Sequence, residues 1–230
     1  MSETQHRALL LEARSETPRL RFLSLQVPMA VAQAYRVPGQ FVEISLRPGA
    51  PGAFFAMANP PGGGRFELLV REGEGLASQL WRLAPGDEIW TSLPLGRGFP
   101  LDDARGRDVL LFATGSGFAP IRALLHAILG EREAYGEVHL FLGVRTEQDF
   151  PFPQELAGLP ARGVHTHLTV SRRPPEPSGH ARYVQEKFRE VLPPVRDAVA
   201  YLCGIAGMVE GVEEELVRAG MPRERIHVNL

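Results

Sequence analysis

The sequence is poor in two residue types that many binding and catalytic motifs require, since it holds one cysteine, Cys203, and one lysine, Lys187, among 230 residues. A single cysteine excludes an intrachain disulfide, a cysteine-ligated iron–sulfur cluster and a cysteine-rich zinc site within these residues. Lys187 stands between Glu186 and Phe188. The Gly-Lys-Ser/Thr end of the phosphate loop of nucleoside triphosphatases is therefore absent as well.

Long apolar runs and a charge excess are also missing. No apolar run reaches membrane-spanning length, and the first seven residues are polar without the apolar region of a signal peptide. The formal net charge is −2, from 25 basic and 27 acidic residues, with no basic block. We therefore expect a cytoplasmic globular protein that binds neither nucleic acid nor membrane.

Residues 6–92 read as short strands separated by turns such as Pro38-Gly39 and Pro85-Gly86. Strands are predicted at 8–12, 20–27, 41–46, 53–58, 66–70 and 88–92. This spacing indicates a small antiparallel barrel or sandwich. A short helix is expected at 76–83, behind Gly75, and its N-terminus is either a second phosphate site or a plain cap of the barrel.

The composition shifts to Gly, Pro, Arg and Asp over residues 93–107, which indicates a linker. Beyond it, strands and helices alternate and predict a parallel sheet covered by helices on both faces. The strands are expected at 108–113, 138–143, 164–170, 199–203 and 226–228, and the helices at 119–129, 153–159, 183–191 and 208–219. We predict a barrel domain at 1–104 and an α/β domain at 105–230.

The stretch 109–120 is the most informative part of the second half. Five apolar residues run into the turn Thr114-Gly-Ser-Gly117, and apolar residues at helical spacing follow, with Pro120 suited to a first helical turn. Free N–H groups and the helix dipole would face outward from this turn toward an anion such as a nucleotide pyrophosphate. A tight turn within an ordinary strand–helix unit remains the alternative on this stretch alone.

Two further strand ends carry cationic residues where open α/β sheets bind ligands. Gly143-Val-Arg145 follows the second strand, and Ser171-Arg-Arg173 follows the third. Arginine at these positions suits the 2′-phosphate of NADPH better than the ribose hydroxyls of NADH, although Glu147 and Asp149 lie close in sequence. The alternative is a solvated loop.

Three other patterns give weaker signals. Cys203 ends the fourth strand and opens a glycine turn that leads to Met208, and we interpret its thiol as packing rather than a nucleophile. His165 and His167 share one face of a strand, but no third ligand is evident, so no metal site is expected. Gly115-Ser-Gly117 lacks the spacing of a serine-hydrolase nucleophile elbow.

In this order and spacing, the segments resemble the ferredoxin-NADP reductase-like flavoproteins across nearly the whole chain. That family has a six-stranded FAD-binding barrel followed by a five-stranded nicotinamide-binding α/β domain. The matching segments are 38–42 (PGQFV), 75–78 (GLAS), 85–87 (PGD), 95–99 (LGRGF), 114–120 (TGSGFAP), 143–145 (GVR), 171–172 (SR) and 203–208 (CGIAGM).

The resemblance implies sites for two cofactors, FAD and NAD(P)H. The residues implied at the FAD site are Phe55, Ala56, Met57, Ala58, Asn59, Val70, Gly75, Ala77 and Ser78. The residues implied at the NAD(P) site are Thr114, Gly115, Ser116, Gly117, Pro120, Arg145, Ser171, Arg172, Cys203, Gly204 and Met208. Thr114 and Cys203 would lie near the nicotinamide. Hydride transfer between the two cofactors requires alignment and exclusion of water, so no catalytic acid or base is assigned.

The sequence departs from the family at the strand that faces the flavin. Ala53, Phe55 and Ala56 occupy the positions of an Arg-x-Tyr-Ser motif, as in a divergent branch of the family, and no aromatic residue ends the sequence. Two functions follow. One is an FAD-dependent NAD(P)H oxidoreductase that passes electrons to a small molecule or carrier protein. The other is a non-catalytic NAD(P)-binding module or an electron-transfer subunit of a larger complex with weak or no flavin binding.

Overall fold

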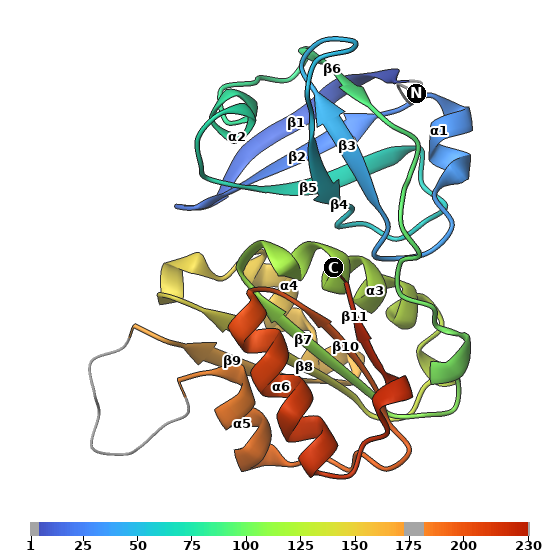
Figure 1. Cartoon of the computed structure of the whole chain (residues 1–230), viewed down its shortest axis with the longest axis vertical. Helices are drawn as coiled ribbons and strands as arrows, with labels where there is room; N and C mark the ends of the chain where they lie inside the picture. Colours follow the sequence, from blue (N-terminus) through green and yellow to red (C-terminus); the bar gives the residue numbers. More distant parts are fainter. Residues whose placement is uncertain (1–4, 173–181, 230) are drawn as a thin grey trace.

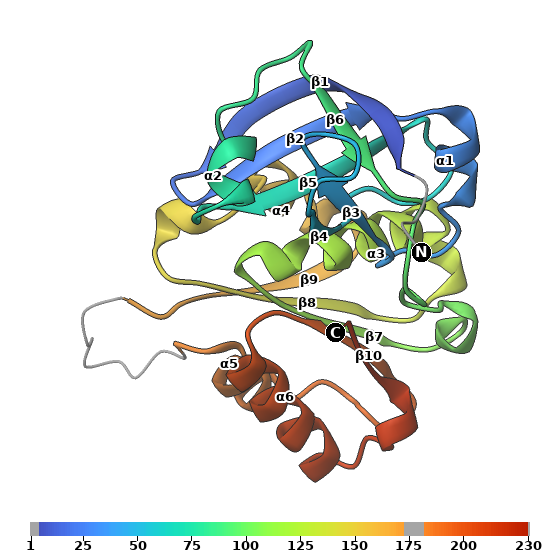
Figure 2. The same ribbon diagram turned by 45° about the horizontal axis from the view of Figure 1, so that its top comes forward.

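The computed structural model describes residues 5–172 and 182–229 and has two parts, a barrel and a layered α/β unit (Figure 1). Figures 1 and 2 both place helices α3 (Phe118–Gly130) and α4 (Pro153–Gly158) between the parallel sheet and the barrel. Among the described residues, no helix has the length and apolar character that crossing a bilayer requires. Our domain boundary between residues 104 and 105, in the connection between the two sheets, stays a prediction.

The barrel is a six-stranded antiparallel sheet in the order β4-β3-β6-β1-β2-β5. A bridge between Met57 and Leu68 joins the end of the first strand in this order to the last. Alternating side chains fill the interior, and Leu23, Leu25 and Ile44 are fully buried there. The strands are β1 (His6–Thr17), β2 (Leu20–Gln26), β3 (Phe41–Ser45), β4 (Ala53–Ala56), β5 (Arg65–Arg71) and β6 (Glu88–Thr91).

Three features of the barrel differ from the sequence-based expectation. Strand β1 continues to Thr17, beyond the predicted end at residue 12, because its polar second half pairs with β2. Helix α1 (Met29–Ala34) was not predicted, since it spans six residues and no side chain caps it. The predicted helix at 76–83 is α2 (Leu76–Leu80), which ends earlier than expected.

The second unit is a five-stranded parallel sheet in the order β11-β10-β7-β8-β9, which confirms the predicted fold class. Its strands are β7 (Val109–Thr114), β8 (Val138–Val144), β9 (Val164–Val170), β10 (Val199–Cys203) and β11 (Ile226–Val228). Helices α3 and α4 pack on one face, and α5 (Val184–Val191) and α6 (Ala206–Arg218) pack on the other.

Short 3-10 helices occupy several connections of this unit. They are η1 (Asp102–Ala104), η2 (Gly115–Gly117), η3 (Arg132–Ala134), η4 (Glu147–Asp149), η5 (Pro160–Arg162) and η6 (Arg223–Arg225). The most important of them is η2, because it converts the glycine turn after β7 directly into helix α3. The carboxyl end of the central strand thus meets a helix N-terminus without an intervening loop.

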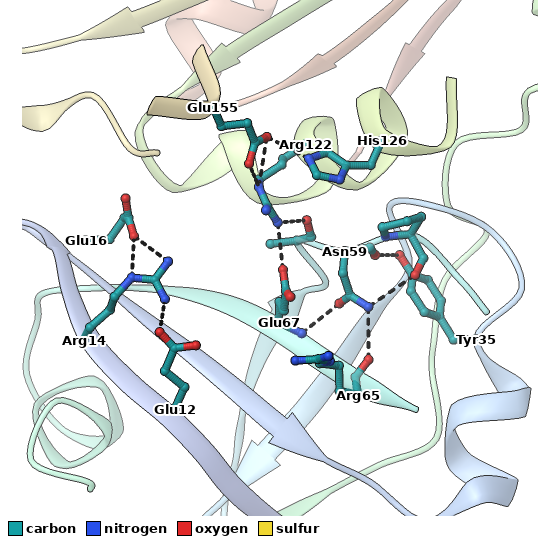
Figure 3. A network of polar contacts seen from close by, with 12 residues as sticks. Glu12, Arg14, Glu16, Tyr35, Asn59, Arg65, Glu67, Arg122, His126 and Glu155 are labelled. Carbon is teal, nitrogen blue, oxygen red and sulfur yellow. Dashed lines mark hydrogen bonds and ion pairs between the residues drawn. The ribbon is translucent and has the colours of Figure 1, made fainter. Parts of the chain in front are cut away.

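Arg122 of α3 links the two units through a compact polar network (Figure 3). Its Nη1 donates to the carbonyl oxygen of Ala58 at 2.7 Å and to Glu67 at 2.8 Å, both in the barrel. Its Nε donates to Glu155 of α4 at 2.9 Å, and His126 bonds the same carboxylate at 2.7 Å. Burial disfavours the charged form of Glu155, but His126 and Arg122 outweigh it and hold its pKa below the usual value.

Phe152, at the start of α4, makes a second link between the units. Its ring meets Phe22 of β2 edge to face at 5.7 Å between centroids, and the guanidinium of Arg122 lies 4.2 Å from its ring centroid. Its N–H donates to Glu16 of β1 at 2.7 Å. Phe152 has a left-handed φ of 50°, which costs roughly 1 kcal/mol or more. The contacts across the interface offset this strain and fix the barrel against the sheet.

Candidate functional site

A cavity of about 620 Å³ lies between the barrel and the carboxyl edge of the parallel sheet. The sheet contributes the turn between β7 and α3, the ends of β8 and β9, the start of α5 and the turn between β10 and α6. The barrel contributes Thr17, Arg19, Leu20, Ala56 and Arg71. Open α/β sheets bind ligands at this edge, so the cavity has the position expected for a nucleotide.

The predicted NAD(P) residues converge on this cavity from the ends of four strands, β7, β8, β9 and β10. Those that line it are Thr114, Gly115, Ser116, Gly117, Pro120, Arg145, Ser171, Cys203, Gly204 and Met208. Arg172 does not line it. That residue is exposed, and its N–H donates to the carbonyl oxygen of Arg145 at 2.9 Å. Arg173, which the sequence analysis also considered, lies outside the described residues.

The two glycine turns at the centre of the cavity are packed directly against each other. A Cβ on Gly117 would lie 2.5 Å from the carbonyl oxygen of Cys203, and a Cβ on Gly204 would lie 2.1 Å from Thr114 Oγ1. The N–H of Ile205 donates to that hydroxyl at 3.2 Å. Gly117 is therefore required for contact between the two turns, in addition to the close ligand approach that the sequence suggested.

An unsatisfied polar atom on the cavity wall supports ligand binding there. Thr169 is one of the residues that line the cavity, and its hydroxyl is buried with no hydrogen-bond partner among the described residues. Buried hydroxyls of this kind are nearly always bonded in folded proteins, to protein, water or ligand. A nucleotide has suitable donors and acceptors, so the cavity fits such a group.

Cys203 lies beside this turn but is not equipped for nucleophilic chemistry. Burial raises the pKa of its thiol to about 11, so the reactive thiolate is scarce at neutral pH. Its side chain packs against the core shared by α3 and the sheet. The interpretation of this residue as a packing residue therefore agrees with its surroundings.

We expect Cys203→Ala to retain most of the NAD(P)H-dependent turnover that the sequence resemblance implies, because hydride transfer between two cofactors requires no thiolate. Iodoacetamide at pH 8 should label the native thiol slowly and the same protein in guanidinium rapidly, as followed by mass spectrometry. A native thiol that reacts as fast as the denatured one, together with loss of turnover in the alanine variant, would contradict this assignment.

Cationic groups gather where β8 and β9 end. Arg145 is exposed and lines the cavity, and Arg182 donates from Nη2 to the carbonyl oxygen of Ser171 at 2.6 Å. Asp149 also lines this region, but its carboxylate accepts from the N–H and hydroxyl of Thr146, at 3.0 and 2.7 Å. Sequence reasoning missed Arg182, because nothing in its local pattern separates it from other surface arginines.

Helix α2, which lies outside the cavity but follows the cavity-lining Arg71 in the chain, has a first turn that suits the diphosphate of a dinucleotide. Helix α2 begins behind Gly75, which has a φ of +63°, and no side chain caps its first turn. The Ser78 hydroxyl donates to the carbonyl oxygen of Gly75 at 2.9 Å, and no side-chain cap accepts from the N–H groups of this first turn. Arg19 and Arg71 line the adjacent cavity wall. Sequence reasoning missed both arginines.

The other residues predicted for FAD lie at different depths. Of Phe55 to Asn59, only Ala56 lines the cavity, whereas Met57 and Ala58 are fully buried and Phe55 packs against the barrel core. The Asn59 amide bonds backbone groups of its own turn. Val70 is buried in β5, and Gly75, Ala77 and Ser78 belong to α2 outside this cavity. The proposed contacts of all these residues with FAD stay predictions.

An antiparallel barrel joined to a parallel sheet, with a cavity at the carboxyl edge of that sheet, is the arrangement expected of a nucleotide-dependent oxidoreductase. Comparisons with known proteins agree. The family model described as "Oxidoreductase NAD-binding domain" matches residues 111–214. A protein named ferredoxin–NADP reductase B from Sorangium cellulosum is 34% identical over 96% of this chain and 95% of its own length.

Two other similar proteins extend this result. Sulfhydrogenase 1 subunit gamma from Pyrococcus furiosus is 31% identical over 98% of this chain and 79% of its own length. The structure of a Neisseria gonorrhoeae ferredoxin NADP⁺ reductase with bound FAD and NADP has the same fold, with a TM-score of 0.81 and 20% identity, over 98% of this chain and 99% of that one. The chain belongs to the ferredoxin-NADP reductase-like flavoprotein family. It is an NAD(P)H oxidoreductase whose cofactors are FAD and NAD(P)H.

Proposed function

We propose that this chain takes electrons from NADPH and delivers them through FAD to a small iron–sulfur carrier of the ferredoxin type. The observation that carries the proposal is the shared cavity, which brings the β7–α3 turn of the sheet within one space with Ala56 and two arginines of the barrel. The printed name of the Sorangium relative supports the choice of acceptor. The side chains that line the cavity therefore suit electron transfer between bound cofactors better than acid–base or nucleophilic catalysis.

Each half of the cavity has a distinct task. FAD, when bound, supplies the ability to accept two electrons from the nicotinamide and to release them one at a time. The first turn of α2 and Arg71 would hold its diphosphate through N–H groups and positive charge. The turns at Gly117 and Gly204 would orient the nicotinamide ring. The packed interface around Phe152 and Arg122 would hold the two units in alignment for hydride transfer.

The preference for NADPH rests on the charges at the ends of β8 and β9. Arg145 faces the cavity, while the nearby carboxylate of Asp149 is occupied as the cap of η4. An NADH-selective site instead presents a free carboxylate to the ribose hydroxyls. A guanidinium beside a capped acid favours a 2′-phosphate, which gives NADPH the advantage.

The proposal is tested on the purified protein. Its absorption spectrum should show bound flavin, or should do so after titration with FAD, and anaerobic NADPH should bleach the flavin band. Reduction of a [2Fe–2S] ferredoxin should then depend on both cofactors. A protein that binds no added FAD, or whose flavin stays oxidised under excess NADPH and NADH, would overturn the proposed function.

We expect Arg145→Ala to raise the KM for NADPH by about 10-fold while the KM for NADH changes little, because one exposed charge-assisted hydrogen bond to the 2′-phosphate is lost. Steady-state kinetics with both nucleotides measure the effect. Arg162→Ala removes an exposed arginine at the opposite edge of the sheet and is the matched control. Equal increases in the KM values for NADPH and NADH would show that Arg145 does not contact the 2′-phosphate.

Membership of a larger electron-transfer complex is a second candidate, favoured by the similarity to a protein that is named as a hydrogenase subunit. Native mass measurement on the chain purified at its natural expression level distinguishes the two. A defined heteromeric mass supports a subunit, whereas a single-chain mass with full turnover supports an independent reductase.

A further inference from the structure

Three titratable side chains meet at the amino ends of β8 and β9, on the edge of the sheet away from the nucleotide cavity. Glu137 precedes β8, and His139 of β8 lies directly opposite His165 of β9 in the parallel register. One ligand atom from each of the three lies within 4.8 Å of the other two. The sequence analysis considered only His165 and His167, whereas the structure brings together a different set, in which His165 meets His139 of β8 and Glu137 just before that strand.

The central imidazole of this group is held in place. His139 is 9% exposed, and its ring stacks on that of His165 with centroids 4.6 Å apart. Its Nδ1 lies 3.1 Å from His167 Nε2. When Nδ1–H donates to that nitrogen, His139 keeps the tautomer with a lone pair on Nε2. Histidine ligands in metal sites are oriented in this way, with the second ring nitrogen bonded to a neighbouring acceptor.

We propose that Glu137, His139 and His165 bind one Zn²⁺ ion, with His167 as the residue that orients His139 and with water as the fourth ligand. Two imidazoles and one carboxylate are a ligand set that zinc prefers, and three protein ligands plus water complete a tetrahedron. His165 Nε2 and Glu137 Oε2 are already 2.5 Å apart. Zinc would replace that contact with two coordinate bonds of about 2.0–2.2 Å.

The surroundings allow the small movements that closure around an ion requires. The side chains of Glu137 and His165 are 61% and 53% exposed, so both can change rotamer at little cost. The two nearby charged side chains, Asp108 and Arg132, carry opposite charges. Asp108 accepts from the N–H of Glu137 at 2.8 Å, and the guanidinium of Arg132 is bonded to three backbone carbonyl oxygens of nearby turns.

The proposed zinc site ties the edge strand β9 to its neighbour β8. Within residues 5–172 and 182–229, strand β9 pairs on one side only and ends the sheet. Exposed edges are prone to pairing with other chains, and a metal bridge across the last two strands would rigidify this edge. The site lies about five residues, or roughly 17 Å, along β8 from the cavity. We therefore expect zinc to affect the stability of the unit rather than electron transfer.

The test is a zinc titration of the flavin-loaded protein in competition with a chromophoric chelator. The expected result is one Zn²⁺ per chain, with affinity reduced at least 10-fold in Glu137→Gln and in His165→Asn. Glu133→Gln removes an exposed carboxylate four residues earlier in the chain and should bind zinc as the parent does. Each variant is compared by thermal unfolding without metal, so that a folding defect is recognised.

A second measurement separates a site from incidental surface binding. Equimolar Zn²⁺ should raise the Tm of the parent and of Glu133→Gln, and should leave the Tm of His165→Asn unchanged. The His167→Asn variant should weaken zinc binding by a smaller factor than His165→Asn, because His167 is not a ligand. The proposal fails if the parent binds no zinc at micromolar concentration, or if Glu137→Gln and His165→Asn bind it as tightly as the parent.

Discussion

Arg122→Ala should lower the free energy of unfolding by about 3 kcal/mol, because it leaves two partly buried carboxylates without their shared partner. Glu67 and Glu155 would both lose this cation, and the carbonyl oxygen of Ala58 would lose its donor. For a chain of this size the expected fall in Tm is roughly 6–12 °C. Thermal unfolding followed by circular dichroism measures it.

The pH dependence distinguishes this coupling from a simple loss of packing. The pKa of Glu155 is depressed in the folded protein, so its ionisation stabilises the fold above the ordinary carboxyl value of 4.5, and this contribution is lost as the pH falls through the depressed pKa. Removing Arg122 would bring the pKa of Glu155 closer to its ordinary value. The difference in the free energy of unfolding between the parent and Arg122→Ala should therefore become smaller toward acid pH.

Arg105→Ala is the matched control for this prediction. Arg105 also pairs with a glutamate, Glu131, but both side chains are largely exposed. Exposed pairs contribute little to stability. If the control and Arg122→Ala had the same Tm, the network at the interface would not be a stabilising link between the units.

The nucleotide half of the site could be predicted from sequence because its signals are continuous in the chain. The residues Thr114 to Gly117 and Cys203 to Met208 each combine a strand end, a glycine turn and a helix start. A general rule, that ligands bind at the carboxyl edge of a parallel sheet, then places them together. No knowledge of long-range contacts was required beyond this rule.

The arginines on the cavity wall could not be predicted from the sequence. Arg19, Arg71 and Arg182 all line the cavity, yet each follows or precedes a turn like many other arginines in the sequence. Only their positions in the folded chain distinguish these three arginines from the others. Under the proposed function, Arg71 would supply at the flavin diphosphate a positive charge that Ala53 cannot.

His139 was missed for a different reason. It lies inside the apolar run of β8, whose residues are all buried, so its pattern is that of a core strand. Contact with His165 depends on the register between β8 and β9, and a shift of one residue would turn the imidazole to the opposite face of the sheet. The alternation of side chains in one strand does not determine that register.

Gly117→Ala should reduce kcat/KM for NADPH by about 100-fold, because misplacing a reacting group by about 1 Å has that effect. A Cβ at this position would lie 2.5 Å from the carbonyl oxygen of Cys203 and 2.8 Å from the Cα of Gly204. Both contacts are with backbone, which cannot rotate away, so the two glycine turns must separate. Stopped-flow measurement of flavin reduction by NADPH would report the loss directly.

The flavin content of Gly117→Ala should equal that of the parent, since the substitution lies in the parallel-sheet unit and α2 belongs to the barrel. Gly130→Ala, at the other end of the same helix, is the matched control because a Cβ there meets no atom within 4 Å. It should keep full activity and gain a little stability. If Gly117→Ala reduced flavin with NADPH at the parental rate, contact between the two turns would not determine the nicotinamide position.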